Sequence, residues 1–463
     1  MDCAQLPTPG PLVGAQPTQV PRLSRAHKTE LPDGPGMPSA LQAIGWSRRP
    51  LPFLERCQRR YGDIFTLRIR HIGNWVVLAD PEHIKQVFTA EPEALGVGVA
   101  NTLLGPLLGD RSVMLLEEPE HMSRRRLMLP QFHGERMESY TRMIDEVARD
   151  AIRAWPLDEP FELWPRMQQI TLEVIMRVVF GESAQPDGLR EQLDRLTEWL
   201  NSPRRLALLP LLGPRWIVRD PSYRTVMEPV ERTVLAEIRR RRQSGSTEGE
   251  DIASMLACAT YGDGSPMTEK DLRDELITLL SDGPTATLLA WVFERLLRYP
   301  EKLTRLRDEI ASGDQEGYLD AVVKETMRLC PSVPIVVRRL VKPLELGGYT
   351  LPAGTRVAPC VHLVHRNPRV YPDPLVFRPE RFLENPAGTY TWIPFGGGVR
   401  RCIAASYAQL EMRRVIHTVL SEIDLTSVNV RSERPTRSAI AFSPDQRGMV
   451  IASRRRVAAA QRS

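Results

Sequence analysis

A glycine-rich segment near residue 400 carries residue types that could bind a metal-containing ligand. It reads Phe395-Gly-Gly-Gly-Val-Arg-Arg-Cys-Ile-Ala404. Because the glycines lack a Cβ atom, their backbone amides can approach a flat ligand closely. Cys402 precedes an expected apolar helix, whose first amides favour a thiolate, and Arg400 can pair with a carboxylate of the same ligand. Together these groups describe a haem-thiolate site. The alternative is a buried structural cysteine beside a turn.

The segment resembles the haem loop of the cytochrome P-450 family, F-G-x-G-x-R-x-C-x-[GA], at every fixed position. The matching residues are Phe395, Gly396, Gly398, Arg400, Cys402 and Ala404. The resemblance implies a mainly α fold with a small β region, in which the haem lies between a distal and a proximal helix. It also implies haem b (iron protoporphyrin IX) as the cofactor, with Cys402 as the axial ligand of the iron. Phe395, Gly396 and Arg400 would then belong to the cofactor-binding loop.

A second motif in family order is Glu325-x-x-Arg328. Residues three apart on a helix share a face and can pair. In isolation such a pair is usually a solvated surface ion pair. The resemblance implies instead a structural lock, completed by Arg381 from the Phe377-Arg-Pro-Glu-Arg-Phe382 segment, which shapes the haem pocket and takes no part in the chemistry.

Further arginines and a histidine match positions that bind the haem propionates in the family. His121 and Arg125 are four residues apart and point the same way from one helix. They resemble the family's H-x-x-x-R motif, although alone they would read as surface residues. Arg338 matches another propionate-binding position and is favoured over Arg339.

The expected distal helix departs from the family pattern. The family usually reads A-G-x-[DE]-T-T, where an acid and a hydroxyl deliver protons to bound oxygen. This chain reads Ser281-Asp-Gly-Pro-Thr-Ala-Thr287, which lacks that pair in either alignment. Thr285 is the first candidate for the hydroxyl and Thr287 the second, while Asp282 is a candidate proton source.

The rest of the chain predicts many helices and few strands. The clearest helix opens with Thr268-Glu-Lys-Asp271, a capping box, and runs to about Arg298. Pro284 removes a backbone amide and clashes one turn earlier, so this helix should kink there. Other helices are expected at 50–61, 318–330 and 403–421, and strands at 63–70, 73–79, 333–337, 344–349 and 356–361, with a hairpin near 437–452.

Composition limits the remaining possibilities. The chain has 463 residues and a net charge of +5, which is too mild to indicate a nucleic-acid partner. Its six cysteines are scattered without a C-x-x-C pair, which favours a reducing cytoplasm. Residues 1–38 are rich in proline and contain no apolar run, so we expect a flexible lead-in rather than a membrane anchor, followed by one domain at 39–463.

The resemblance implies a monooxygenase that inserts one oxygen atom from O2 into an apolar small molecule. The chain shows no flavin or nicotinamide domain, so electrons are expected from a separate ferredoxin and ferredoxin reductase. Arg124, Arg126 and Arg401 should form the basic patch that docks the ferredoxin, and a monomer is expected. Two alternatives stay open: a peroxide-driven or rearranging haem-thiolate enzyme, and a non-catalytic haem protein that binds a ligand.

Overall fold

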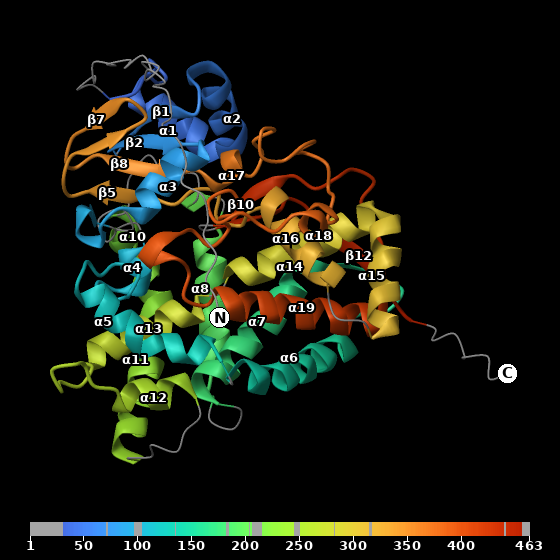
Figure 1. The fold of residues 1–463 in the computed structure, drawn as a ribbon. Coiled ribbons are helices and arrows are strands. Elements are labelled where there is room, and N and C mark those ends of the chain that lie inside the picture. Colours follow the sequence, from blue (N-terminus) through green and yellow to red (C-terminus); the bar gives the residue numbers. More distant parts are fainter. Residues whose placement is uncertain are drawn as a thin grey trace, which may run out of the picture.

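The computed structural model describes residues 31–70, 73–96, 104–134, 136–181, 185–202, 204–205, 215–244, 251–281, 283–313, 317–438 and 441–455. The expected lead-in lies largely outside these residues, and so does Asp282. Helices dominate the described part, and small sheets lie at its edges (Figure 1).

The N-terminal part combines short helices with the strands of one sheet. Its helices are α1 (Ser39–Arg48), α2 (Pro50–Tyr61), α3 (Pro81–Thr89), α4 (Gly105–Leu108) and α5 (Glu120–Met128), with 3-10 turns η1 (Pro92–Ala94) and η2 (Leu129–Phe132). The strands of this sheet are β1 (Ile64–Ile69), β2 (Gly73–Leu78), β8 (Arg356–Pro359), β5 (Arg338–Leu340) and β3 (Leu95–Gly96), in that spatial order. β2 and β8 are parallel and the other neighbours are antiparallel.

The long helices build the other end of the molecule (Figure 1). They are α6 (Arg136–Arg153), α7 (Leu163–Phe180), α8 (Leu189–Leu200), α11 (Pro221–Ser244), α13 (Glu269–Leu280), α14 (Gly283–Arg298), α15 (Pro300–Ser312), α16 (Gly317–Leu329) and α19 (Ala405–Glu422). Two shorter helices, α10 (Arg215–Arg219) and α12 (Ile252–Cys258), precede α11 and α13 in the chain. α19 packs against α6, and α14 packs against α7. Their apolar faces share the largest buried cluster, which makes this helical layer the main core.

Short elements connect the two ends. They are α17 (Val361–Val364), α18 (Arg381–Glu384) and η3 (Gly398–Arg400), the hairpins β6 (Leu344–Leu346)–β7 (Tyr349–Leu351) and β10 (Pro435–Ser438)–β11 (Ala441–Pro444), and the sheet β4 (Pro160–Glu162)–β12 (Met449–Arg454)–β9 (Ile423–Ser427). The hairpin expected near 437–452 is therefore only partly right. Its first strands pair with each other, but β12 pairs with β4 and β9.

One expected strand does not form. Residues 333–337 are irregular, and regular pairing begins only at Arg338, opposite Val357. Pro334 has no amide hydrogen to donate, while its carbonyl accepts from the amide of His362. A proline of this kind interrupts a ladder, which explains the failed prediction.

The expected kink in the long helix is a complete break. α13 begins with the expected capping box of Thr268 and Asp271 and ends at Leu280, and α14 begins at Gly283. Proline is well tolerated in the first turn of a helix, so Pro284 starts a new helix rather than bending the old one.

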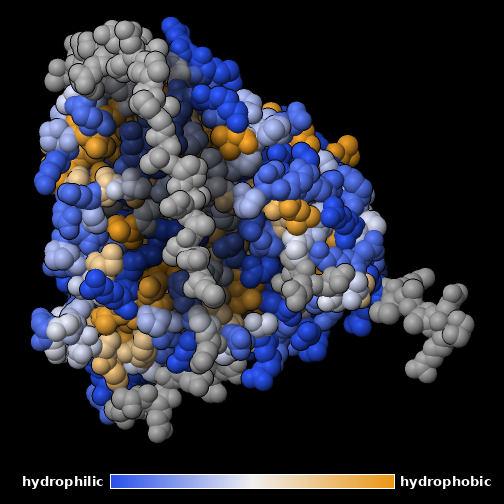
Figure 2. Space-filling view, in the orientation of Figure 1, coloured by the Kyte–Doolittle hydropathy of each residue, from blue (hydrophilic) through white to orange (hydrophobic). Residues whose placement is uncertain are grey.

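The stretch Glu269–Arg298 is the one part of the described chain that is long and apolar enough to cross a membrane. Its apolar window is 76% buried inside the protein, as in the core helix of a globular domain. Hydrophobic side chains on the face seen in Figure 2 form separate patches among hydrophilic ones. The stretch is therefore weak evidence for a membrane span.

Candidate active site

Cys402 lies in the loop between η3 and α19. Its amide donates to the carbonyl of Phe395 at 3.0 Å, which closes the loop. Its side chain is exposed. The helix that follows starts at Ala405, so two residues separate the thiol from the first helical turn.

Most other described cysteines are poorly suited to bind a metal. Cys57, Cys330 and Cys360 are buried, and burial raises the pKa of Cys57 to about 11 and that of Cys360 to about 12. Since the thiolate is the metal ligand, such groups are disfavoured. Cys258 is exposed at the end of α12, but the residue two positions before it is Leu256, where the Cys402 loop has Arg400.

The glycines of the loop are required by its packing on α3. Gly396 and Gly398 have φ angles of +69° and +66°, a region that favours glycine. A Cβ atom at Gly397 would lie 2.2 Å from a ring carbon of Phe88, and one at Gly398 would lie 2.5 Å from the backbone oxygen of Phe88. This contact could not be predicted from the sequence, because Phe88 is more than 300 residues away.

Two buried guanidinium groups flank the loop. Arg338 and Arg400 line the same small cavity beside Gly397 and Gly398. Arg338 forms no ion pair with any described carboxylate, and burial together with Arg400 lowers its pKa to about 10. Nη1 of Arg400 donates to the carbonyl of Leu116 at 2.7 Å, whereas Nη2 has no hydrogen-bond partner among the described residues. The cavity is therefore rich in positive charge.

His121 and Arg125 approach the loop from α5. Nδ1 of His121 lies 2.7 Å from Oε1 of Glu118, and Nη2 of Arg400 lies 3.4 Å from the same oxygen. Burial, and then Arg400, lowers the pKa of His121 to about 4, so the ring is neutral at pH 7. Burial lowers the pKa of Arg125, and the nearby Cys402 opposes that effect. Sequence reasoning missed Glu118, although it stands in the acidic run just before His121.

A haem group fits these residues. Arg338 is buried and has no carboxylate partner among the described residues, which is costly unless an anion satisfies it. Nη2 of Arg400 lies 3.4 Å from Glu118 and 4.0 Å from Glu117 but makes no hydrogen bond with a described residue, so it can also accept an anion. The haem edge carries two carboxylates, which suit Arg338 and Arg400. The exposed thiol of Cys402 suits the iron.

Glu325, Arg328 and Arg381 meet in a buried ion-pair cluster. Nε of Arg328 lies 2.7 Å from Oε2 of Glu325, and Nε of Arg381 lies 3.1 Å from Oε1. Arg328 also donates to the carbonyls of His365 and Pro374. The cluster joins α16 to the segment that leads to Cys402.

The break between α13 and α14 exposes Ser281 and Gly283, although the helices on either side are largely buried. Thr285 and Thr287 are both buried in α14. Two residues apart on a helix, their side chains point in nearly opposite directions. Oγ1 of Thr287 accepts from Nε1 of Trp164 in α7 at 3.3 Å, so Thr287 faces α7.

The basic patch expected at Arg124, Arg126 and Arg401 is wrong for Arg124. Arg124 is only 1% exposed and lies 2.7 Å from both Asp271 and Glu275 of α13. Consecutive residues on a helix point about 100° apart, so a run of arginines cannot share one face. Arg126 and Arg401 are exposed.

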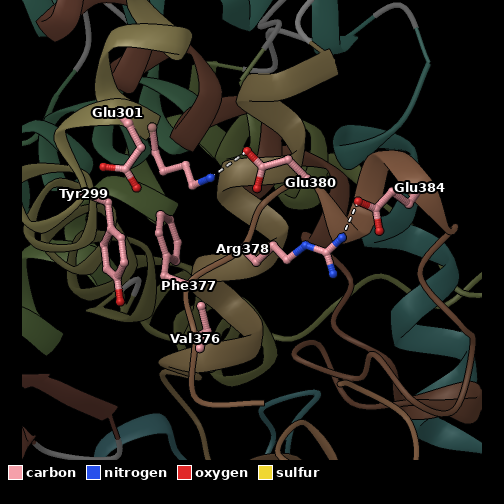
Figure 3. A pocket seen from close by; sticks show the side chains of 8 residues that line it. Tyr299, Glu301, Val376, Phe377, Arg378, Glu380 and Glu384 are labelled. Carbon is pink, nitrogen blue, oxygen red and sulfur yellow. Dashed lines mark hydrogen bonds and ion pairs between the residues drawn. The ribbon is translucent and has the colours of Figure 1, made fainter. Parts of the chain in front are cut away.

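A pocket of about 440 Å³ lies between the start of α15 and the 376–384 segment. Neither the Cys402 loop nor Arg338 lines it. Figure 3 shows Arg378 pointing toward Glu384, with which it pairs. Glu380 of the same pocket lies 3.0 Å from Lys302. Glu325 accepts from the amide of Arg378, so this pocket borders the buried ion-pair cluster. It contains no group suited to redox chemistry.

Comparison with known proteins agrees with this geometry. The family model "Cytochrome P450" matches residues 32–450. "Putative cytochrome P450 135B1" of Mycobacterium tuberculosis is 40% identical over 435 residues, which cover 91% of each chain. "Putative cytochrome P450 138" of Mycobacterium bovis is 36% identical over 440 residues, 92% of this chain and 97% of that protein.

Solved structures show the same fold. "Retinoic acid bound cyanobacterial CYP120A1" superposes with a TM-score of 0.80 at 22% identity, covering 92% of this chain and 100% of the other. The chain belongs to the cytochrome P-450 family. It has the P-450 fold, and it is a haem-dependent monooxygenase.

Proposed function

We propose that this enzyme inserts one oxygen atom from O2 into an apolar organic substrate, with haem b bound through Cys402 and electrons from a separate ferredoxin and ferredoxin reductase. The exposed Cys402 thiol beside two buried, incompletely paired arginines carries the proposal. When bound, the haem supplies oxygen activation, and its thiolate ligand favours O–O cleavage.

The side chains around the loop have separate tasks. Arg338, Arg400, His121 and Arg125 would hold the two propionates, and Arg125 also lies near Cys402. Phe395 and Gly396 shape the loop. Glu325, Arg328 and Arg381 act on structure alone, since their polar atoms bind one another and backbone carbonyls.

We assign proton delivery on the distal side to residues at the break between α13 and α14. Thr285 is the first candidate for a hydroxyl that faces the haem, because Thr287 faces α7. Asp282 lies outside the described residues and stays a candidate proton source. Neither Thr285 nor Thr287 directly follows an acidic residue, as the hydroxyl residue does in the family pattern.

Electrons have to reach the site from outside the matched part of the chain. The family model accounts for residues 32–450, and Arg126 and Arg401 are exposed near the Cys402 loop. Exposed basic side chains steer an acidic partner. We place the enzyme in the cytoplasm as a monomer with one domain at 39–463, in keeping with its scattered, mostly buried cysteines.

The test is turnover under isotopically labelled O2 with a ferredoxin, its reductase and NADPH. One labelled oxygen atom per product molecule is expected. Product formed only with peroxide, and unlabelled by O2, would contradict the proposal.

A peroxide-driven or rearranging reaction is the second candidate. The absence of the family's acid and hydroxyl pair from the 281–287 segment supports it, because such reactions do not need that pair. It predicts faster turnover with peroxide than with ferredoxin.

A further inference from the structure

Phe88 is a buried aromatic residue near the end of α3 that takes no part in the proposed chemistry. It nevertheless lies directly against the loop that carries Cys402. A Cβ atom at Gly397 would lie 2.2 Å from Cδ2 and 2.5 Å from Cε2 of the Phe88 ring. A Cβ atom at Gly398 would lie 2.5 Å from the backbone oxygen of Phe88. The end of α3 therefore packs on two consecutive glycines of the loop.

Gly397 differs from Gly398 in what excludes a side chain there. At Gly397 φ is −162° and ψ is 175°, an extended backbone that any residue adopts. The three atoms nearest to a Cβ atom at this position, apart from its chain neighbours, all belong to the ring of Phe88. At Gly398 φ is +66°, and the nearest atoms are backbone. The ring of Phe88, rather than backbone strain, thus excludes a side chain at Gly397.

Two backbone hydrogen bonds connect the position of Gly397 to that of Cys402. The amide of Cys402 donates to the carbonyl of Phe395 at 3.0 Å, and the amide of Arg401 donates to the carbonyl of Gly398 at 3.1 Å. Gly397 lies between Phe395 and Cys402 in the loop that these bonds close. Because the bonds fix the internal geometry of the loop, a shift of Gly397 is expected to move Cys402 as well.

Phe88 also lines the small cavity beside Arg338 and Arg400. It belongs to a buried apolar cluster on which Val336 packs, two residues before Arg338. A Cβ atom at Gly396 would lie 3.7 Å from Cγ1 of Val336, which is an ordinary contact. The loop therefore lies between Phe88 and the segment that leads to Arg338, so the ring helps to fix where the loop stands relative to this arginine.

The haem that the proposed function requires is a rigid planar group. Its iron would bind Cys402 while its carboxylates bind Arg338 and Arg400, so the loop has to lie at the right place relative to both arginines. Groups of a functional site have to be held within about 0.5 Å of their productive geometry. A methyl group at Gly397 would have 2.2 Å where ordinary contact needs 3.4 Å, a deficit of about 1.2 Å. The buried ring has little room to yield, so the loop would have to move.

We propose that Phe88 is a positioning residue of this enzyme, whose ring fixes the Cys402 loop relative to Arg338 and Arg400, and that the missing side chain at Gly397 is its steric complement. The inference rests on the proposed function. It requires that substitutions at Phe88 and Gly397 compensate for each other in the ligation of the iron. A role in packing alone would change stability and haem content without such compensation.

The test is a double-mutant cycle of Phe88→Ala and Gly397→Ala, which needs neither substrate nor turnover. The absorption spectrum of the reduced, CO-treated holoprotein gives the share of bound haem with the strongly red-shifted Soret band of thiolate ligation. Gly397→Ala should lower this share about 5-fold or more, because overpacking destabilises the parent arrangement. In the double variant the methyl group enters the space that the ring has left, so the share should rise again above that of Gly397→Ala.

Two matched controls separate this effect from a general loss of stability. Gly398→Ala meets the backbone oxygen of Phe88, which Phe88→Ala leaves in place, so no recovery is expected for that pair. Ile84→Ala removes a fully buried side chain of α3 that does not line the cavity. It should lower the urea unfolding midpoint, keep the share of thiolate-ligated haem, and fail to rescue Gly397→Ala.

Phe88→Leu replaces Phe88→Ala in the cycle where the alanine variant does not fold, because leucine keeps part of the apolar volume but lacks the ring, and part of the recovery is then expected. Full thiolate ligation in Gly397→Ala would overturn the positioning role. Absence of recovery in the double variant, or equal recovery with Ile84→Ala, would overturn it too. A parent protein that binds haem without the red-shifted band contradicts the proposed function instead, since the loop would then not supply the ligand.

Discussion

Removal of the Glu325 carboxylate should destabilise the protein strongly. In Glu325→Ala, Arg328 and Arg381 lose their shared acid, although they are 0% and 6% exposed. The amide of Arg378 loses its acceptor as well. Breaking a buried ion pair by removing one partner costs about 3–5 kcal/mol. That is a large part of the stability of an ordinary domain.

Urea unfolding of the purified holoprotein, together with its haem content, measures this effect. The matched control is Asp320→Ala on the same helix, whose ion pairs with Lys324 and Arg413 are partly exposed. Exposed pairs contribute about 0–1 kcal/mol, so the control should change little. A Glu325→Ala holoprotein with the parent's unfolding midpoint and full haem content would refute the structural role, and so would an equal loss in both variants.

The remaining predictions concern protons and electrons. Thr285→Ala should lower coupled turnover about 10–100-fold with release of peroxide. Thr287→Ala should instead cost about 1–3 kcal/mol of stability, since Nε1 of Trp164 loses its acceptor. Peroxide assays and urea unfolding of both variants distinguish these effects, and the reverse pattern would contradict the assignment. Arg126→Glu should slow stopped-flow reduction by ferredoxin at low salt and have little effect at high salt; equal rates at low salt would remove Arg126 from the docking surface. Because the pKa of Glu275 is raised on folding, its contribution to stability is present at acid pH and is lost as pH rises toward about 8. Between the ordinary carboxyl pKa of 4.5 and about pH 8, the difference in unfolding free energy between parent and Glu275→Gln should change by up to about 1.4 kcal/mol per pH unit. A pH-independent difference would contradict a neutral Glu275.

The sequence predicted the elements that local rules control. Proline at the start and glycine after the end delimit α2 at residues 50–61, as expected. The capping box placed the start of α13. The strand expected at 333–337 failed because Pro334 lacks an amide hydrogen.

Contacts between distant segments were beyond sequence patterns. Arg124 was expected at the surface as part of a docking patch, because it shares a helix with His121 and Arg125, yet α13 supplies its acids from about 150 residues away. The run of acids in the first half of α13, Asp271, Asp274 and Glu275, was the available signal for such a partner. Likewise, the glycine motif predicted the loop around Cys402, but its packing against Phe88 depends on the tertiary fold.

The central claim is that Cys402 is the thiolate ligand of the haem iron. The most direct measurement is the absorption spectrum of the reduced, CO-treated protein, with Cys258→Ala as the control because Cys258 is the other exposed cysteine of the described chain. The parent and Cys258→Ala should show the strongly red-shifted Soret band of thiolate-ligated haem, and Cys402→Ala should not. A Cys402→Ala protein that keeps this band would contradict the account.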